Sequence, residues 1–141
     1  MFSKLTLVVL AIFIFSCSNE NETKKEECNE TPCTQNFVTI SISIKDAAGV
    51  PVPLDSFKVV AIDTSKDLTL VSHDQEFENH KKDGFYPLFS DAYRIQYQNA
   101  TTTISFKGYI SDNEVINEVY EVGADCCHVS LTSGNIDLVL D

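Results

Sequence analysis

Strict alternation of apolar and polar residues is the dominant pattern of this chain beyond residue 36. The clearest example runs from Val38 to Lys45, where Val38, Ile40, Ile42 and Ile44 alternate with threonine, serine and lysine. A period of two places successive side chains on opposite faces of an extended chain. We therefore predict a β-strand here, with one buried face and one face in water.

Further strand-like segments follow to the end of the chain, although Phe57–Ile62 is apolar on both sides and Val115–Val122 is mixed in parity. The further predicted strands are 57–62, 68–71, 85–89, 93–98, 102–110, 115–122, 127–131 and 136–140. Turn-forming residues separate them, as in Asp46–Gly49, Ser111–Asn113 and Thr132–Asn135. The segment Ser72–Gly84 is highly charged, with Phe77 as its only large apolar residue, and we expect it to be a long loop. The pattern predicts an all-β fold, an antiparallel β-sandwich of seven to eight strands, immunoglobulin-like or transthyretin-like in architecture.

The start of the chain follows a different pattern. Lys4 precedes Leu5–Phe15, an apolar run with Thr6 as its only polar residue, and polar residues resume directly after Ser16 and Cys17. A basic start, a short apolar run and a small residue at the end are typical of a secretory signal peptide. The run is shorter than the roughly 20 residues that a transmembrane helix needs. We therefore expect export of the chain.

The end of that run, Ile14-Phe15-Ser16-Cys17, resembles the lipobox of bacterial lipoproteins. The resemblance implies that residues 1–16 are a cleaved lipoprotein signal peptide. It also implies that Cys17 carries a diacylglyceryl group and becomes the mature N-terminus. The expected location is the bacterial cell envelope, with the protein lipid-anchored to the outer membrane.

Residues 17–35 are polar and mostly acidic, and we expect them to form a tether that ends in disulfides. Such a composition cannot bury enough apolar surface to fold. An acidic run after the lipid-bearing cysteine also resembles the surface-export signal of some Gram-negative lipoproteins, so both a periplasmic and a surface-exposed location stay open. The expected organisation is 1–16 signal peptide, 17–35 tether and 36–141 β-sandwich domain.

The chain has five cysteines. If Cys17 carries lipid, four remain, and an even number in an exported protein indicates disulfides. Cys28 and Cys33 precede the first strand, and Cys126 and Cys127 are adjacent at the start of a late one. In one pairing, each of the first two bonds one of the last two; in the other, Cys28 bonds Cys33 and Cys126 bonds Cys127.

A zinc site built from these thiols, with or without His128, is disfavoured because the spacing is not a paired CxxC knuckle. We expect no cofactor and no metal, since motifs for phosphate, calcium and zinc-protease sites are absent from the sequence. We also expect no catalytic residue. The net charge of −11 disfavours nucleic acid as a partner, because binding to phosphates depends on lysine and arginine.

The turn between the first two predicted strands, Asp46-Ala47-Ala48-Gly49-Val50-Pro51-Val52, resembles the opening of transthyretin-like, carboxypeptidase-regulatory-like domains. The segment Asp125–Leu131, followed by Ser133-Gly134, is similar to the end of small bacterial lipoproteins that carry such a sandwich. The resemblance implies a sandwich of seven or eight strands without catalysis of its own.

These expectations favour a non-catalytic, lipid-anchored envelope protein that binds a protein or glycan partner or serves as an accessory module. The alternative is an envelope hydrolase or metal-dependent enzyme that uses His73, His80 and nearby acids. A purely structural envelope protein is a third hypothesis, and a surface patch of tyrosines would count against it. The distance between the two histidines separates the first two hypotheses.

Overall fold

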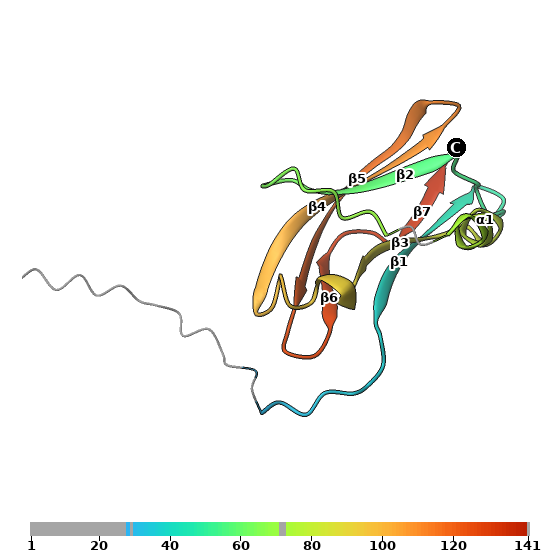
Figure 1. Ribbon diagram of the computed structural model, residues 1–141. Coiled ribbons are helices and arrows are strands. Elements are labelled where there is room, and N and C mark those ends of the chain that lie inside the picture. The colour runs from blue at the N-terminus through green and yellow to red at the C-terminus, as the bar shows by residue number, and fades with distance from the viewer. Residues whose placement is uncertain (1–27, 29, 71–72, 141) are drawn as a thin grey trace, which may run out of the picture.

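The chain folds into two facing β-sheets, shown in Figure 1 by a computed structural model that describes residues 28, 30–70 and 73–140. The strands are β1 (Thr39–Asp46), β2 (Ser56–Ala61), β3 (Phe85–Ser90), β4 (Ala100–Ile110), β5 (Asn113–Ala124), β6 (Val129–Ser133) and β7 (Asp137–Leu140). The described residues also contain the α-helix α1 (Asp74–Asp83) and the 3₁₀-helix η1 (Asp91–Tyr93). The predicted all-β sandwich is confirmed.

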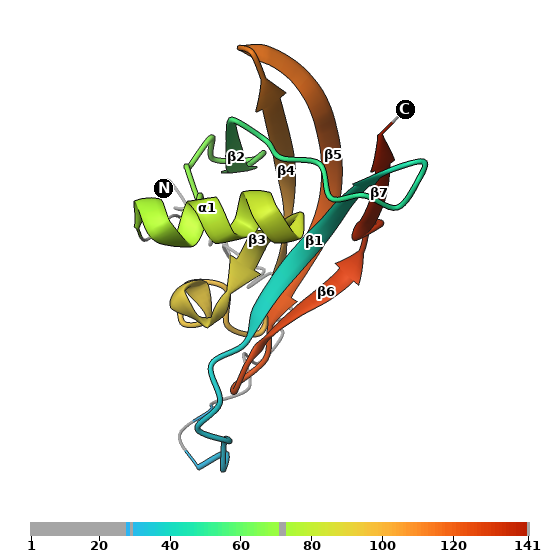
Figure 2. The same ribbon diagram turned by 90° about the vertical axis from the view of Figure 1, so that its right-hand side faces the viewer.

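The smaller sheet has the strand order β3-β1-β7, and the larger has the order β2-β4-β5-β6. The larger sheet is antiparallel throughout, whereas β7 runs parallel to β1 in the smaller one. Figure 2 shows the smaller sheet in front of the larger, with α1 beside β3. The sequence pattern predicts most of these strands but not their pairing, because periodicity carries no information about which strands are neighbours.

The core lies between the sheets and is built from the apolar face of each strand. Ile42 and Ile44 of β1 are fully buried, as their alternation predicts. The ring of Phe57 on β2 joins the layers, since it stacks on Phe106 at 5.5 Å and meets Tyr86 of the other sheet edge-on at 5.7 Å. Aromatic pairs in these geometries contribute beyond the apolar area that they bury.

The connection from β6 to β7 is not a hairpin turn, because the two strands lie in different sheets. The segment between them crosses the open edge of the sandwich and is held there by Tyr120, whose hydroxyl donates to the carbonyl of Asn135 at 2.8 Å. Gly134 has φ +122° at this point, and its lack of a side chain leaves room for the Tyr120 ring.

The expected loop at Ser72–Gly84 is wrong, because this segment contains α1. Acidic residues in the first turn and basic residues in the last turn favour a helix through its dipole. Gly84 ends the helix in the left-handed conformation, with its N–H bonded to the carbonyl of His80. The helix packs on the core mainly through Phe77, whose ring centroid lies 6.0 Å from that of Phe57. Because a single large apolar side chain makes this contact, the helical sequence shows no hydrophobic stripe.

The expected strand at 93–98 is also wrong. η1 and a further helical turn occupy the segment, and the N–H of Tyr97 donates to the carbonyl of Tyr93. Residues four apart share a face in a helical turn as well as in a strand. Tyr93 and Tyr97 both pack on Phe89, at 5.6 and 5.4 Å, whereas Ile95 is 77% exposed.

The expected strand at 68–71 is reduced to an extended segment beside β2. The N–H of Leu68 donates to the carbonyl of Val59, and Asp67 forms an isolated bridge with Val60. The segment covers the edge of the larger sheet with one buried side chain, Leu68. Among the described residues, no helix is long and apolar enough to cross a bilayer.

Candidate functional site

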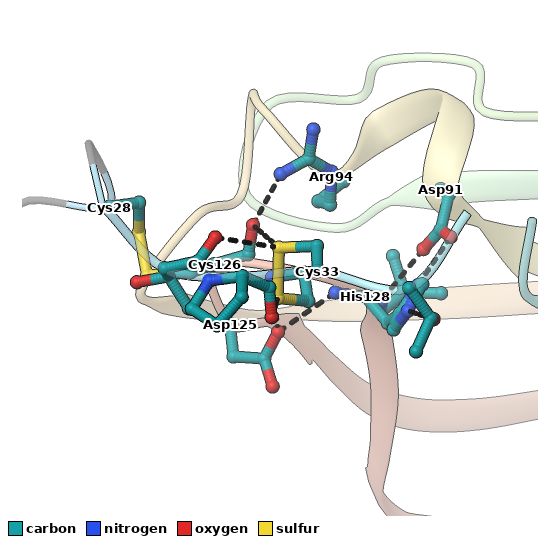
Figure 3. Close-up of a disulfide and its surroundings, with 12 residues drawn as sticks. Cys28, Cys33, Asp91, Arg94, Asp125, Cys126 and His128 are labelled. Carbon is teal, nitrogen blue, oxygen red and sulfur yellow. Dashed lines mark hydrogen bonds and ion pairs between the residues drawn. A yellow bond between two sulfur atoms is a disulfide. The ribbon is translucent and has the colours of Figure 1, made fainter. Parts of the chain in front are cut away.

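Two disulfides join the segment before β1 to the bend before β6. Cys28 bonds Cys126 and Cys33 bonds Cys127, with Cα–Cα distances of 5.3 and 5.2 Å (Figure 3). This is the first of the two pairings left open by the sequence, and it excludes both the vicinal pairing and a thiolate zinc site. Cys17, the predicted lipidation site, lies outside the described residues.

The adjacent cysteines do not begin a strand as expected, because β6 starts only at Val129. They lie in a bend organised by Asp125, whose Oδ1 accepts the N–H groups of His128 at 2.8 Å and Cys127 at 2.6 Å. These two bonds hold the pKa of Asp125 below its ordinary value. The bend therefore presents both cysteines and His128 toward the N-terminal segment.

A chain of side-chain hydrogen bonds, which the sequence did not reveal, lies next to the disulfides. His128 Nδ1 is 2.8 Å from Asp91 Oδ2, and His128 Nε2 is 2.7 Å from Thr34 Oγ1. Figure 3 shows His128 and Asp91 facing each other close to Cys33. The three residues come from the N-terminal segment, from η1 and from the bend before β6. No sequence motif could have indicated them, because 37 positions separate Asp91 from His128 and 94 separate Thr34 from it.

Asp91 is held by more than the histidine. Its carboxylate also accepts the backbone N–H groups of Val38 and Val129, each at 2.9 Å. Burial would raise the pKa of Asp91, but the bonds from His128, Val38 and Val129 outweigh burial and leave the pKa below its ordinary value. An ionised carboxylate accepts from Nδ1–H, so in the neutral imidazole Nε2 is left as the acceptor that faces Thr34.

An open cavity of about 260 Å³ lies beside this group. Its lining includes Thr34, Asp91 and His128, together with Gln35, Asn36 and Arg94. Arg94 is the only arginine of the chain, and its Nη1 donates to the carbonyl of Cys126. The cavity therefore combines a hydroxyl, an imidazole, a carboxylate and a guanidinium within one rigid, disulfide-linked corner of the fold.

His73 and His80, the sequence-predicted alternative site, are not brought together. His73 immediately precedes α1 and His80 lies on the helix seven residues later, a separation of about 10 Å along a helix. His73 is the exposed N-cap residue, and His80 Nε2 is 3.8 Å from Glu76 of the same helix. Within residues 28, 30–70 and 73–140, no three histidine, cysteine or acidic side chains are grouped to hold a metal ion.

The tyrosines do not form a surface platform. Tyr86, Tyr97 and Tyr120 are buried in the core, and Tyr93 and Tyr109 are half-buried. Burial and the nearby charge of Glu118 raise the pKa of Tyr120 to about 12. These side chains therefore stabilise the sandwich instead of presenting a shared aromatic surface.

Comparisons of the chain with protein-family models, with curated proteins and with solved structures found no match. The resemblances to lipoproteins and to transthyretin-like domains thus stay predictions from the sequence.

Proposed function

We propose that the chain is a lipid-anchored protein of the bacterial outer membrane whose β-sandwich serves as a binding or accessory module for an envelope protein or glycan. Cys17 carries the lipid in this proposal, and the acidic tether links it to the folded domain. The membrane is engaged through the lipid, since a chain of net charge −11 is repelled by anionic headgroups.

The observation that supports this proposal best is the pair of disulfides at the N-terminal edge of the sandwich. Disulfides form in oxidising compartments such as the periplasm and the cell surface. The four cysteines pair with one another, so neither bond requires Cys17. The fifth cysteine is thus left for the modification that its position in the lipobox-like segment predicts.

The disulfides also define the reach of the anchor. An extended chain spans at most about 3.6 Å per residue, so the eleven steps from Cys17 to Cys28 allow about 40 Å. Beyond Cys28, covalent bonds fix the segment to the bend before β6. The domain is therefore held close to the membrane by a tether whose far end cannot separate from the fold.

The anchor is tested by a Cys17→Ala variant, expressed in a Gram-negative host that is fed an alkyne-bearing fatty acid. We expect the wild type to incorporate the label and to sediment with outer membranes, and the variant to do neither. Ser18→Ala is the matched control and retains both properties. A labelled Cys17→Ala variant, or an unlabelled wild-type protein, contradicts the proposal.

A further inference from the structure

We propose that Thr34, His128 and Asp91 form a nucleophile, general base and orienting carboxylate that hydrolyse short carboxylic esters in the polar cavity beside the disulfides. This inference goes beyond the anchored module proposed above. It replaces the sequence-based expectation of a chain without catalytic residues.

The contacts among the three residues follow the order that a nucleophile, a base and an orienting group require. A hydroxyl nucleophile requires a base within about 2.6–3.2 Å and a third group that orients the base. Thr34 Oγ1 lies 2.7 Å from His128 Nε2, and Asp91 Oδ2 lies 2.8 Å from His128 Nδ1. Asp91 thus selects the tautomer in which Nε2 can accept the proton of the Thr34 hydroxyl.

Burial changes along the three residues in the direction that this chemistry needs. The side chain of Asp91 is 8% exposed and that of His128 is 24% exposed, whereas Thr34 is exposed and lines the cavity. The carboxylate is therefore shielded and fully bonded, and the hydroxyl is accessible to a substrate.

The disulfide between Cys33 and Cys127 fixes the base relative to the nucleophile. Thr34 follows Cys33 directly, and His128 follows Cys127 directly. The covalent bond thus holds together two residues that 94 positions separate. Restricting a nucleophile and its base to one geometry removes the entropy cost of bringing them together.

The proposed reaction has two steps, acylation of Thr34 and hydrolysis of the acyl-threonine ester. In the first, Thr34 Oγ bonds to the ester carbonyl carbon while its proton moves to His128 Nε2 and the carbonyl electron pair moves to oxygen. Collapse of this intermediate breaks the bond to the alcohol, which leaves with the proton from His128 and forms an acyl-threonine ester. In the second step, water attacks that ester by the same route, releasing the carboxylic acid and restoring the hydroxyl.

Arg94 is the group that can stabilise the negative oxygen of each intermediate. A guanidinium has five N–H donors, and among the described residues the one side-chain hydrogen bond of Arg94 runs from Nη1 to the Cys126 carbonyl. Arg94 lines the same cavity as Thr34 and His128. A fixed positive charge at the position where negative charge develops is a major source of catalysis.

The size and chemistry of the cavity limit the substrate class. Its volume of about 260 Å³ is below the range of about 300–1,000 Å³ typical of sites for drug-sized ligands. The amide side chains of Gln35 and Asn36 make the wall polar. We therefore expect acetyl esters and similarly short acyl groups, with the alcohol part extending toward solvent.

The test uses the full mature protein with both disulfides formed. Hydrolysis of p-nitrophenyl acetate is measured, and a fluorophosphonate probe is mapped to its residue by peptide mass spectrometry. Thr34→Val removes the hydroxyl and keeps the branched shape, and Thr34→Ser keeps a hydroxyl. Thr64→Val, at an exposed turn residue away from the cavity, is the matched control.

We expect the probe to label position 34 in the wild type, in Thr34→Ser and in Thr64→Val. We expect no label at position 34 in Thr34→Val. We expect Thr34→Val and His128→Gln to lower ester hydrolysis at least tenfold. Thermal unfolding, followed for all variants, shows whether each remains folded.

The proposal is overturned if folded wild-type protein leaves Thr34 unlabelled and hydrolyses the ester no faster than Thr34→Val. In that case the three residues are only a clasp that holds the N-terminal segment. Labelling at another residue, unchanged by Thr34→Val, overturns it equally.

Discussion

At the residue scale, Asp91 is the point where three distant parts of the chain meet. Its carboxylate accepts from Val38 at the start of the domain, from Val129 of β6 and from His128. A hydrogen bond to a charged group contributes about 1.5–3 kcal/mol to the free energy of unfolding, more than a bond between neutral groups. Asp91 therefore stabilises the fold whether or not the neighbouring hydroxyl acts in catalysis.

The lowered pKa of Asp91 makes this contribution dependent on pH. Since the pKa in the folded state lies below the ordinary value of 3.8, the contribution is complete above about pH 4–5. It is lost as the pH falls through the folded-state pKa. We expect Asp91→Asn to lower the free energy of unfolding by about 1–3 kcal/mol at pH 7.

Urea unfolding of wild type and Asp91→Asn, measured from pH 7 down to pH 2.5, tests this expectation. The difference between the two proteins should shrink below pH 4. A difference that stays constant over the whole range would show that the ionised carboxylate is not what stabilises this corner.

Gly134 gives a second prediction at the residue scale. A Cβ atom at this position would lie 2.3 Å from Cδ1 of Tyr120, and the backbone has φ +122°. We expect Gly134→Ala to lower the free energy of unfolding by about 2–4 kcal/mol, through overpacking and backbone strain together.

Gly49→Ala is the matched control, because Gly49 also has a positive φ, +80°, but no atom lies within 4 Å of the added Cβ. It should cost about 1 kcal/mol, from backbone strain alone. Equal losses at the two positions in urea unfolding would show that contact with Tyr120 does not matter.

At the element scale, α1 shows how a helix can form without a hydrophobic stripe. Its charges follow the helix dipole, and Gly84 terminates it, but none of its residues is fully buried. Its N-cap residue, His73, makes no side-chain capping bond. The N-terminus of the helix is therefore the part that a substitution can improve.

We expect His73→Asp to raise the free energy of unfolding by about 0.5–1 kcal/mol. An aspartate at the N-cap can accept a free N–H of the first turn and also opposes the positive end of the dipole. The unfolding midpoint in urea measures the effect, and His73→Ala serves as the control, with little change. A His73→Asp variant no more stable than His73→Ala would mean that the helix begins elsewhere.

At the scale of the whole molecule, the two disulfides are a pair of neighbouring crosslinks between the N-terminal segment and the sandwich. They close loops of 98 and 94 residues that overlap almost completely. Once one bond has formed, the second closes only a short additional loop of about seven residues. Each bond should therefore contribute little to stability while the other bond is present, and much more once the other bond is absent.

In the chain-entropy estimate, replacing either pair of cysteines by alanine costs about 2 kcal/mol, and replacing all four costs about 7 kcal/mol. We expect the Cys28→Ala/Cys126→Ala and Cys33→Ala/Cys127→Ala variants to stay folded, and the fourfold variant to lose much of its stability. Urea unfolding of the three variants gives the comparison. Simple additivity, with the fourfold loss equal to the sum of the two pairs, would contradict the shared-loop argument.

Features that depend on local pattern and composition could be predicted from the amino-acid sequence. The period of two in Val38–Lys45 identified β1 because a half-buried strand must alternate, whatever lies opposite it. The Asp46–Gly49 turn follows from local chemistry, since Asp46 Oδ1 accepts the N–H groups of Ala48 and Val50. An even set of four cysteines, in a chain that the N-terminal pattern predicts to be exported, predicted two disulfides for the same kind of reason.

Which segments of the chain contact one another became clear only from the folded structure. The spacing of Tyr93 and Tyr97 fits a strand and a helical turn equally well, and packing on Phe89 selected the turn. Likewise, nothing local marks Thr34 or Asp91, because their roles depend on His128, which chain closure brings beside them. Periodicity reports how each segment meets its own surroundings, whereas the meeting of distant side chains is fixed by strand order and disulfides, and that is where this protein's candidate site arises.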